Sequence, residues 1–273
     1  MFKFLERAKN QCSKKHDHDD PTYVHLIRLR QLIGWLGIAL PWIVVYCSKL
    51  GSQGSEWPLS ISATWYTNAC TPFMIILGSA ALLLICYEGY ELIDDITMTI
   101  AGLAGLGICL FPCEYEKYVG DLVGTLQLPV KVSDFAHMTC AIIFFVALTF
   151  ASLCLFTRSA QSKTDEKKNR NKIYIACGLG MAVSLVALIL CKLCDESVGS
   201  IYHWLFTDVF GGFSFLADAH VWFFEMLALT FFGVSFLTKA GTYPWLCCDK
   251  CKREYKFSRW VAKIKKEIRK SLR

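Results

Sequence analysis

The chain has 273 residues, of which 54% are hydrophobic and only 19% are charged, and its formal net charge at pH 7 is +6. Soluble domains average about 25% charged residues, so the long uncharged stretches of this chain exclude an ordinary soluble enzyme. The apolar content also excludes a disordered chain, a collagen and a small disulfide-rich protein. We therefore expect an integral membrane protein.

Six stretches are long and apolar enough to be transmembrane helices. A helix that rises about 1.5 Å per residue needs about 20 residues to cross the hydrocarbon core, and its backbone groups must be hydrogen-bonded within the segment. In chain order the predicted helices cover residues 32–49, 70–88, 94–112, 134–157, 173–192 and 218–238. The sequence therefore predicts an all-α integral membrane bundle of six transmembrane helices over 32–238, between basic tails at 1–31 and 239–273.

The distribution of basic residues predicts the orientation of these helices. Of the 29 lysines and arginines, four lie on one predicted side, and the others lie in the two tails and in the loop between the fourth and fifth helices. These four are Lys49, Lys117, Lys131 and Lys192. Because cytoplasmic segments carry the excess of positive charge, both termini are predicted to be cytoplasmic. The charge is thus a feature of membrane topology, and no nucleic-acid partner is expected.

The C-terminal tail has the pattern of an amphipathic helix. Phe257, Trp260, Ile264 and Ile268 recur at spacings of three and four residues, and lysines and arginines occupy the other face. Such a helix beside a membrane span is typical of one that lies on the bilayer surface and contacts anionic lipid head groups. The alternative is a solvated helix that packs on the cytoplasmic loops of the protein itself.

Ionisable residues at membrane depth are candidates for a functional site, because burying them in lipid costs free energy. Helix geometry places Glu225 about 10 Å from the outer surface, on the same face as Asp218, and His137 shares a face with Asp134. These groups predict a polar cavity that opens outward. Its candidate residues are Glu225, His137, Asp218, Asp134, Tyr66 and Ser62. His137 is the expected hydrogen-bond partner of Glu225, and the alternative is that both residues only hold helices together.

A second polar cluster is predicted on the cytoplasmic side, in the turn between the second and third helices. It consists of Glu88, Glu91, Asp94 and Asp95. The turn has no lysine or arginine, so we expect its carboxylates to pair with the basic tails, with a cation site as the alternative. No resident metal and no cofactor are expected, because the histidines and aspartates at 16–20 belong to a charged, solvated tail.

Several segments resemble those of small bacterial multi-pass membrane proteins of unknown function. The similar features are SISATWYT at 60–67, YEGYELIDD at 87–95, AGLAGLGICLFP at 101–112, the histidine that opens the fourth helix and the glutamate in the sixth. This resemblance implies six spans in the inner membrane. The chain is also distantly similar to the membrane hydrolases that include alkaline ceramidases and progestin-receptor-like proteins, which implies a zinc ion that activates water. It lacks the His-x-x-x-His pair of those hydrolases.

Three classes of function follow from these observations. The leading prediction is a non-enzymatic sensor, regulator or lipid-interacting protein, which needs only the helical bundle and the basic tails. The first alternative is a transporter of a small molecule or ion that uses Glu225 and His137. The second is a zinc-dependent membrane lipid hydrolase.

Overall fold

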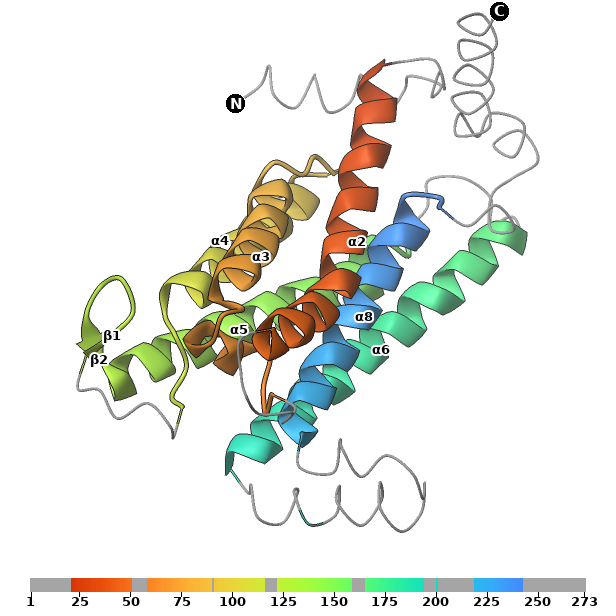
Figure 1. Ribbon diagram of the computed structural model, residues 1–273. Helices are drawn as coiled ribbons and strands as arrows, with labels where there is room; N and C mark the ends of the chain where they lie inside the picture. The colour runs from red at the N-terminus through yellow and green to blue at the C-terminus, as the bar shows by residue number, and fades with distance from the viewer. Residues whose placement is uncertain are drawn as a thin grey trace, which may run out of the picture.

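The computed structural model describes residues 21–50, 58–89, 91–115, 122–158, 165–193, 200 and 219–242. Asp218 and the predicted C-terminal amphipathic helix lie outside these described residues and stay predictions, as do the histidines and aspartates at 16–20. The described part of the chain is mostly helical (Figure 1). It also contains one antiparallel pair of two-residue strands, β1 (Leu122–Val123) and β2 (Leu128–Pro129).

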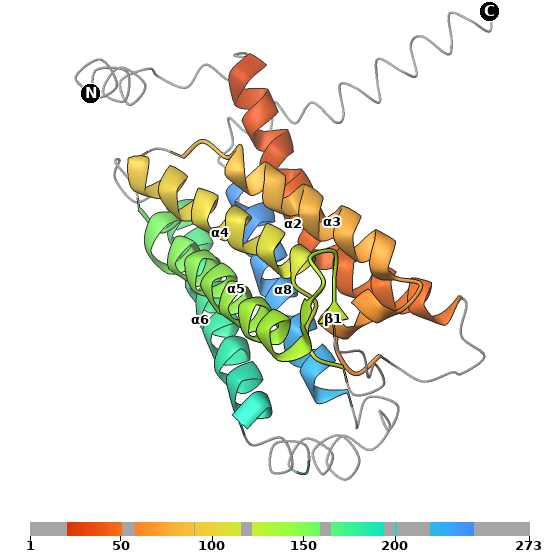
Figure 2. The ribbon, with the colours of Figure 1, turned by 90° about the vertical axis from the view of Figure 1, so that its left-hand side faces the viewer.

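The helices form a closed ring. They are α2 (Pro21–Lys49), α3 (Cys70–Ile85), α4 (Leu92–Leu110), α5 (Val130–Phe150), α6 (Asp165–Leu193) and α8 (His220–Lys239). Each helix packs against the next one in this order, and α8 packs against α2 and closes the ring. Figure 1 shows α8 between α2 and α6, and Figure 2 shows α3, α4 and α5 one beside the other.

Five of these helices are long and apolar enough to cross a membrane. The sixth, α3, has 16 residues. It is therefore about 24 Å long, which is less than the roughly 30 Å of a hydrocarbon core. It packs closely against α4. A Cβ added at Gly102 of α4 would be only 2.5 Å from the carbonyl oxygen of Ala81 of α3, so the two backbones are in close contact. The all-α, multi-helix fold is thus confirmed, whereas six crossings stay a prediction.

The helix ends differ from the predicted ends, and two helices begin much earlier than predicted. The first begins at Pro21 instead of residue 32, and the fifth begins at Asp165 instead of residue 173. Both differences arise because uncharged runs mark the part of a helix that can lie in lipid, whereas charged residues in water continue the same helix. The predicted helix at 134–157 is present as one continuous helix over Val130–Leu155, in which α5 ends at Phe150 and the last five residues form a π-helix, η2 (Ala151–Leu155).

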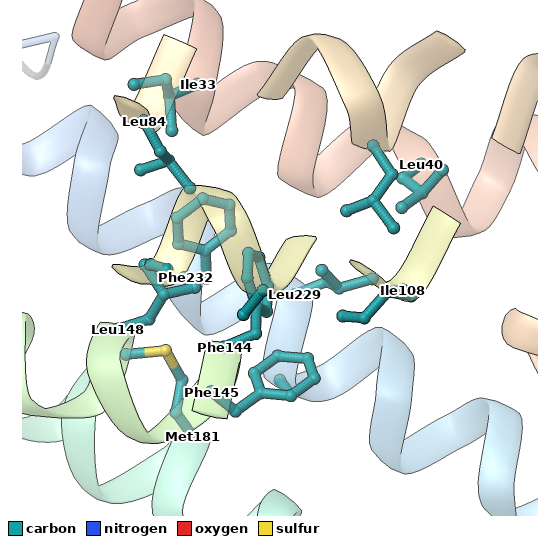
Figure 3. Packing of buried hydrophobic residues seen from close by; sticks show 14 of the residues in the cluster. Ile33, Leu40, Leu84, Ile108, Phe144, Phe145, Leu148, Met181, Leu229 and Phe232 are labelled. Carbon is teal, nitrogen blue, oxygen red and sulfur yellow. The ribbon is translucent and has the colours of Figure 1, made fainter. Parts of the chain in front are cut away.

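Side chains from all of the helices fill the centre of the ring (Figure 3). Phe144 of α5 and Phe232 of α8 are each 1% exposed and meet edge to face with centroids 6.1 Å apart. The contact that closes the ring depends on two glycines: a Cβ added at Gly233 of α8 would be 2.6 Å from the carbonyl oxygen of Gly34 of α2. Small residues of this kind let membrane helices approach closely, and the resulting packing stabilises the bundle.

Candidate functional site

The carboxylate of Glu225 holds the chain segment 59–62 against α8. Its Oε2 accepts a hydrogen bond of 2.5 Å from the backbone N–H of Ile61. Its Oε1 accepts hydrogen bonds from the hydroxyl of Ser62, at 2.9 Å, and from the hydroxyl of Ser60, at 3.3 Å. Three donors from one short segment therefore satisfy both oxygens of a half-buried carboxylate.

A backbone hydrogen bond reinforces this contact. The N–H of Trp222, in the first turn of α8, donates to the carbonyl oxygen of Leu59 at 3.0 Å. First-turn N–H groups have no partner within their own helix, so segment 59–62 satisfies one of them for α8. We call this arrangement, in which Glu225 and Trp222 bind residues 59–62, the α8 latch.

The predicted hydrogen bond between Glu225 and His137 is replaced by other contacts. His137 lies on α5, is 3% exposed, and has its Nδ1 2.7 Å from the carbonyl oxygen of Phe111. A carbonyl oxygen only accepts, so Nδ1 carries the hydrogen. Glu225 is instead engaged with Ser62, a predicted cavity residue, and with its neighbours. The two ionisable groups thus hold different segments of the chain.

His137 belongs to a set of side chains that bind the segment 111–114, just beyond the end of α4. The hydroxyl of Ser133 donates to the carbonyl oxygen of Pro112 at 2.7 Å, the hydroxyl of Tyr66 donates to that of Cys113 at 2.8 Å, and the N–H of Glu114 donates to Oδ1 of Asp134 at 2.9 Å. Each of these four consecutive residues therefore has a backbone group bonded to a side chain, and for the buried Pro112 and Cys113 such a partner is needed because water is excluded. The sequence reasoning missed Ser133, although its four-residue spacing from His137 puts both on one helix face.

The two segments are connected through a short 3-10 helix, η1 (Ser62–Tyr66). Ser62, at its start, binds Glu225, and Tyr66, at its end, binds the 111–114 segment. Tyr66 also stacks on Tyr115, with ring centroids 5.7 Å apart. Five of the six predicted cavity residues thus belong to two hydrogen-bonded groups that η1 connects. Glu225 and Ser62 are in one group, and Tyr66, Asp134 and His137 are in the other. A cavity between them stays a prediction.

Ion pairs join α6 to the same region. Nζ of Lys192, at the end of α6, is 2.9 Å from Oδ2 of Asp134 and 3.9 Å from Oε2 of Glu114. The lysine side chain is 48% exposed, so solvent screens these pairs and each contributes little to stability. Their effect is to place the Asp134 carboxylate between α6 and the 111–114 segment.

Cys113 lies buried where the two groups meet. Burial, followed by the negative charges of Glu225 and Asp134, raises the pKa of the Cys113 thiol to about 12. At physiological pH the thiol is therefore neutral, and a neutral thiol is a poor nucleophile. The described cysteines near this end, Cys70, Cys113 and Cys191, are free thiols.

The acidic residues at the opposite end of α4 serve mainly to cap that helix. Oδ2 of Asp94 accepts from the N–H of Glu91 at 3.2 Å, and Oδ1 of Asp95 accepts from the N–H of Gly89 at 2.6 Å. Carboxylates at a helix N-terminus also interact favourably with the helix dipole. Glu91 itself pairs with Arg158 at 2.7 Å, and Glu88 is exposed. The ion-pair partner that the structure shows is thus Arg158, in the loop after η2. The carboxylate of Asp94 also interacts electrostatically with Lys239, the first residue of the predicted C-terminal tail, and that tail lies outside the described residues from residue 243 onward.

Within the described ranges, no three His, Cys, Asp or Glu side chains are grouped so that they could hold a metal ion. Comparisons of the chain with protein-family models, with curated proteins and with solved structures give no match. The functional argument therefore rests on the geometry of the chain's own residues.

Proposed function

We propose that this chain is a non-enzymatic membrane sensor or regulator, and that the α8 latch is the contact that changes between its states. The observation that supports this proposal is the bonding of Glu225 to residues 60–62. These residues are about 160 positions away in the sequence, so the latch joins the segment before α3 to the last helix of the ring. Hydroxyl and N–H donors bind equally well to water or to a ligand. A small change in protonation or ligand contact at Glu225 would therefore release segment 59–62.

Release of segment 59–62 would affect the rest of the bundle because of the position of α8. This helix packs against both α2 and α6, and it extends from the latch to the opposite end of the ring. Glu225 and Lys239 are 14 residues apart on it, which corresponds to about 21 Å. A rigid helix of this length transmits a displacement at one end to the other.

We also propose that α3 completes a six-span bundle with both termini in the cytoplasm and that the C-terminal tail lies on anionic lipid. Three features support this proposal: the packing of α3 along α4, the separation of basic residues by side, and the apolar stripe at 257–268. In this arrangement the α8 latch is at the outer surface.

The proposed function is tested by the access of a reagent to Cys113. Full-length protein in lipid nanodiscs is treated at pH 8 with a membrane-impermeant maleimide, and labelling of the Cys113 peptide is followed by mass spectrometry. In the wild type the reaction is slow, because the thiol is buried and neutral. In Glu225→Leu we expect labelling on the order of 10-fold faster, because the variant lacks hydrogen bonds worth about 1–3 kcal/mol. Glu225→Gln is the matched control, because it removes the same charge beside the thiol but keeps the hydrogen bonds of the latch, and it is expected to label more slowly than Glu225→Leu.

Other outcomes decide against the proposal. Unchanged Cys113 labelling in a folded Glu225→Leu variant shows that the latch does not control this region. Proton or cation flux into proteoliposomes that is abolished by Glu225→Gln identifies a transporter. Lipid hydrolysis by protein that copurifies with stoichiometric zinc identifies a hydrolase.

A further inference from the structure

Four aromatic side chains contact one another in a row across the helical bundle. The row lies near the C-terminal end of α8, whereas the α8 latch lies near its N-terminal end. Tyr87, just after α3, meets Phe236 of α8 with centroids 6.0 Å apart. Phe236 meets Phe156, just after η2, at 5.3 Å, and Phe156 meets Tyr174 of α6 at 5.6 Å. All of these contacts are edge to face. The row therefore connects the end of α3 with α8 and α6.

Three cations from three different helices lie over rings of this row. Cζ of Arg30 of α2 is 5.2 Å from the ring centroid of Tyr87. Nζ of Lys239 of α8 is 4.9 Å from the centroid of Phe156, and Nζ of Lys167 of α6 is 5.7 Å from that of Tyr174. Lys167 also donates to the carbonyl oxygen of Phe156 at 3.0 Å. The negative faces of the rings attract these cations and hold them near one another.

Among the described residues, most of the charged groups that act on Lys239 are positive. Lys239 interacts electrostatically with three cations, Arg30, Lys167 and Arg170, and with one carboxylate, that of Asp94. Arg30 is only 3% exposed, so solvent screens its charge poorly. Cations gathered in such a partly desolvated place produce a potential that attracts an anion.

We propose that Arg30, Lys167 and Lys239 form a binding site for a phosphate group. The planar guanidinium of arginine presents paired donors that match phosphate oxygens, and lysine contributes a compact charge. The site lies at the ends of helices that are predicted to face the cytoplasmic leaflet, so lipid phosphate is the expected source. This inference does not rest on the α8 latch.

The test measures retention of phosphatidic acid by full-length protein. The protein is reconstituted in nanodiscs of phosphatidylcholine with and without phosphatidic acid, and the bound lipid is counted by native mass spectrometry after release into detergent. We expect selective retention of phosphatidic acid, and we expect Lys167→Gln to lower it about tenfold, the loss of one charge-assisted hydrogen bond. Lys168→Gln removes the same charge from the next residue of α6, whose side chain is exposed and paired with Asp165. This control variant is expected to retain the lipid as the wild type does.

A second arm identifies the source of the phosphate. If inorganic phosphate raises the unfolding temperature in pure phosphatidylcholine nanodiscs and phosphatidic acid adds nothing, the site takes soluble phosphate instead of lipid. If neither probe binds, or if Lys167→Gln and Lys168→Gln weaken retention equally, the proposal is overturned. Lys167→Arg keeps the charge and is expected to keep the lipid, which gives a decisive variant if Lys167→Gln does not fold. Retention that is unchanged in Glu225→Leu shows that this site is independent of the latch.

Discussion

At the scale of single residues, the contacts of Glu225 predict different effects for two substitutions. In Glu225→Gln, the amide oxygen still accepts from the N–H of Ile61 and the amide N–H groups donate to the serine hydroxyls, so stability changes little. Glu225→Leu leaves a backbone N–H and two hydroxyls without this acceptor, and we expect a loss of about 1–3 kcal/mol. Chemical unfolding in detergent measures both. Equal stability of the two variants would contradict the latch.

His137 allows a similar comparison on α5. The side-chain amide of asparagine reaches approximately the position of the histidine Nδ1, so His137→Asn is expected to keep the hydrogen bond to the carbonyl oxygen of Phe111. His137→Phe fills the volume but removes the donor, and we expect it to lower the unfolding free energy by about 1–3 kcal/mol relative to His137→Asn. The same unfolding measurement tests this ranking, and the reverse ranking would show that His137 contributes mainly through packing.

The Cys113 thiol predicts a loss of stability in alkaline solution. Its pKa is raised from 9.0 to about 12 in the folded protein. Between these values the unfolded chain gains a thiolate while the folded protein keeps the thiol, so stability falls as the pH rises above 9. The slope for this group is at most about 1.4 kcal/mol per pH unit. Cys113→Ala should lose less stability than the wild type between pH 9 and 10.5, and parallel curves for the two proteins would refute the assignment.

At the scale of elements, the contact of α2 with α8 depends on Gly233. A Cβ at this position meets the carbonyl oxygen of Gly34 at 2.6 Å and the side chain of Ile38 at 2.5 Å. Because two backbones must move apart to admit it, Gly233→Ala is expected to cost about 1–3 kcal/mol. Gly78 of α3 is the matched control, since a Cβ there meets nothing within 4 Å. Gly78→Ala should be neutral or stabilise by up to about 1 kcal/mol. Thermal unfolding of both variants in one detergent measures the difference, and a stability of Gly233→Ala equal to that of Gly78→Ala would contradict the close contact.

The apolar runs predicted the helices well because lipid and the bundle core select the same composition. They did not predict helix ends: nothing in a run of uncharged residues shows that the helix continues through Arg28 and Arg30 to Pro21. The π-helix at 151–155 was also unpredicted. In the structure its Ser152 donates to the carbonyl oxygen of Tyr174 and lies 2.7 Å from the hydroxyl of Ser235. Such contacts join residues that are far apart in the chain.

The same reason explains the candidate site. Depth along a helix marked Glu225 and His137 as polar groups that need partners, and the structure shows hydrogen-bond partners for both. Depth does not identify a partner, because the folding of segment 59–62 back onto α8 is a property of the chain's path rather than of any local pattern. Tyr66 and Ser62 were found because polar residues cluster before α3, but their distinct roles required the structure.

At the scale of the whole molecule, the closed ring has a different kind of polar chemistry at each end. One end has a carboxylate with its donors, and the other has cations seated on aromatic rings. Both ends include residues of α8, and both are joined by hydrogen bonds or ring contacts to the segments that border α3. If α3 crosses the membrane, it connects the end that contains the α8 latch with the end that contains the cations and aromatic rings. Whether it crosses therefore decides how the two ends are linked.

The topology of the chain tests this arrangement directly. We expect reporter fusions after residues 60, 125 and 205 to behave as exterior and those after residues 90, 165 and 250 to behave as cytoplasmic. The physical reason is that 25 of the 29 lysines and arginines then lie on the cytoplasmic side. Activity of alkaline phosphatase and fluorescence of a green fluorescent protein at each site provide the two complementary readouts. The fusions after residues 60 and 90 are decisive for α3, because they report the same side if this 16-residue helix does not cross. In that case five spans would place the two termini on opposite sides, and the six-span arrangement would be wrong.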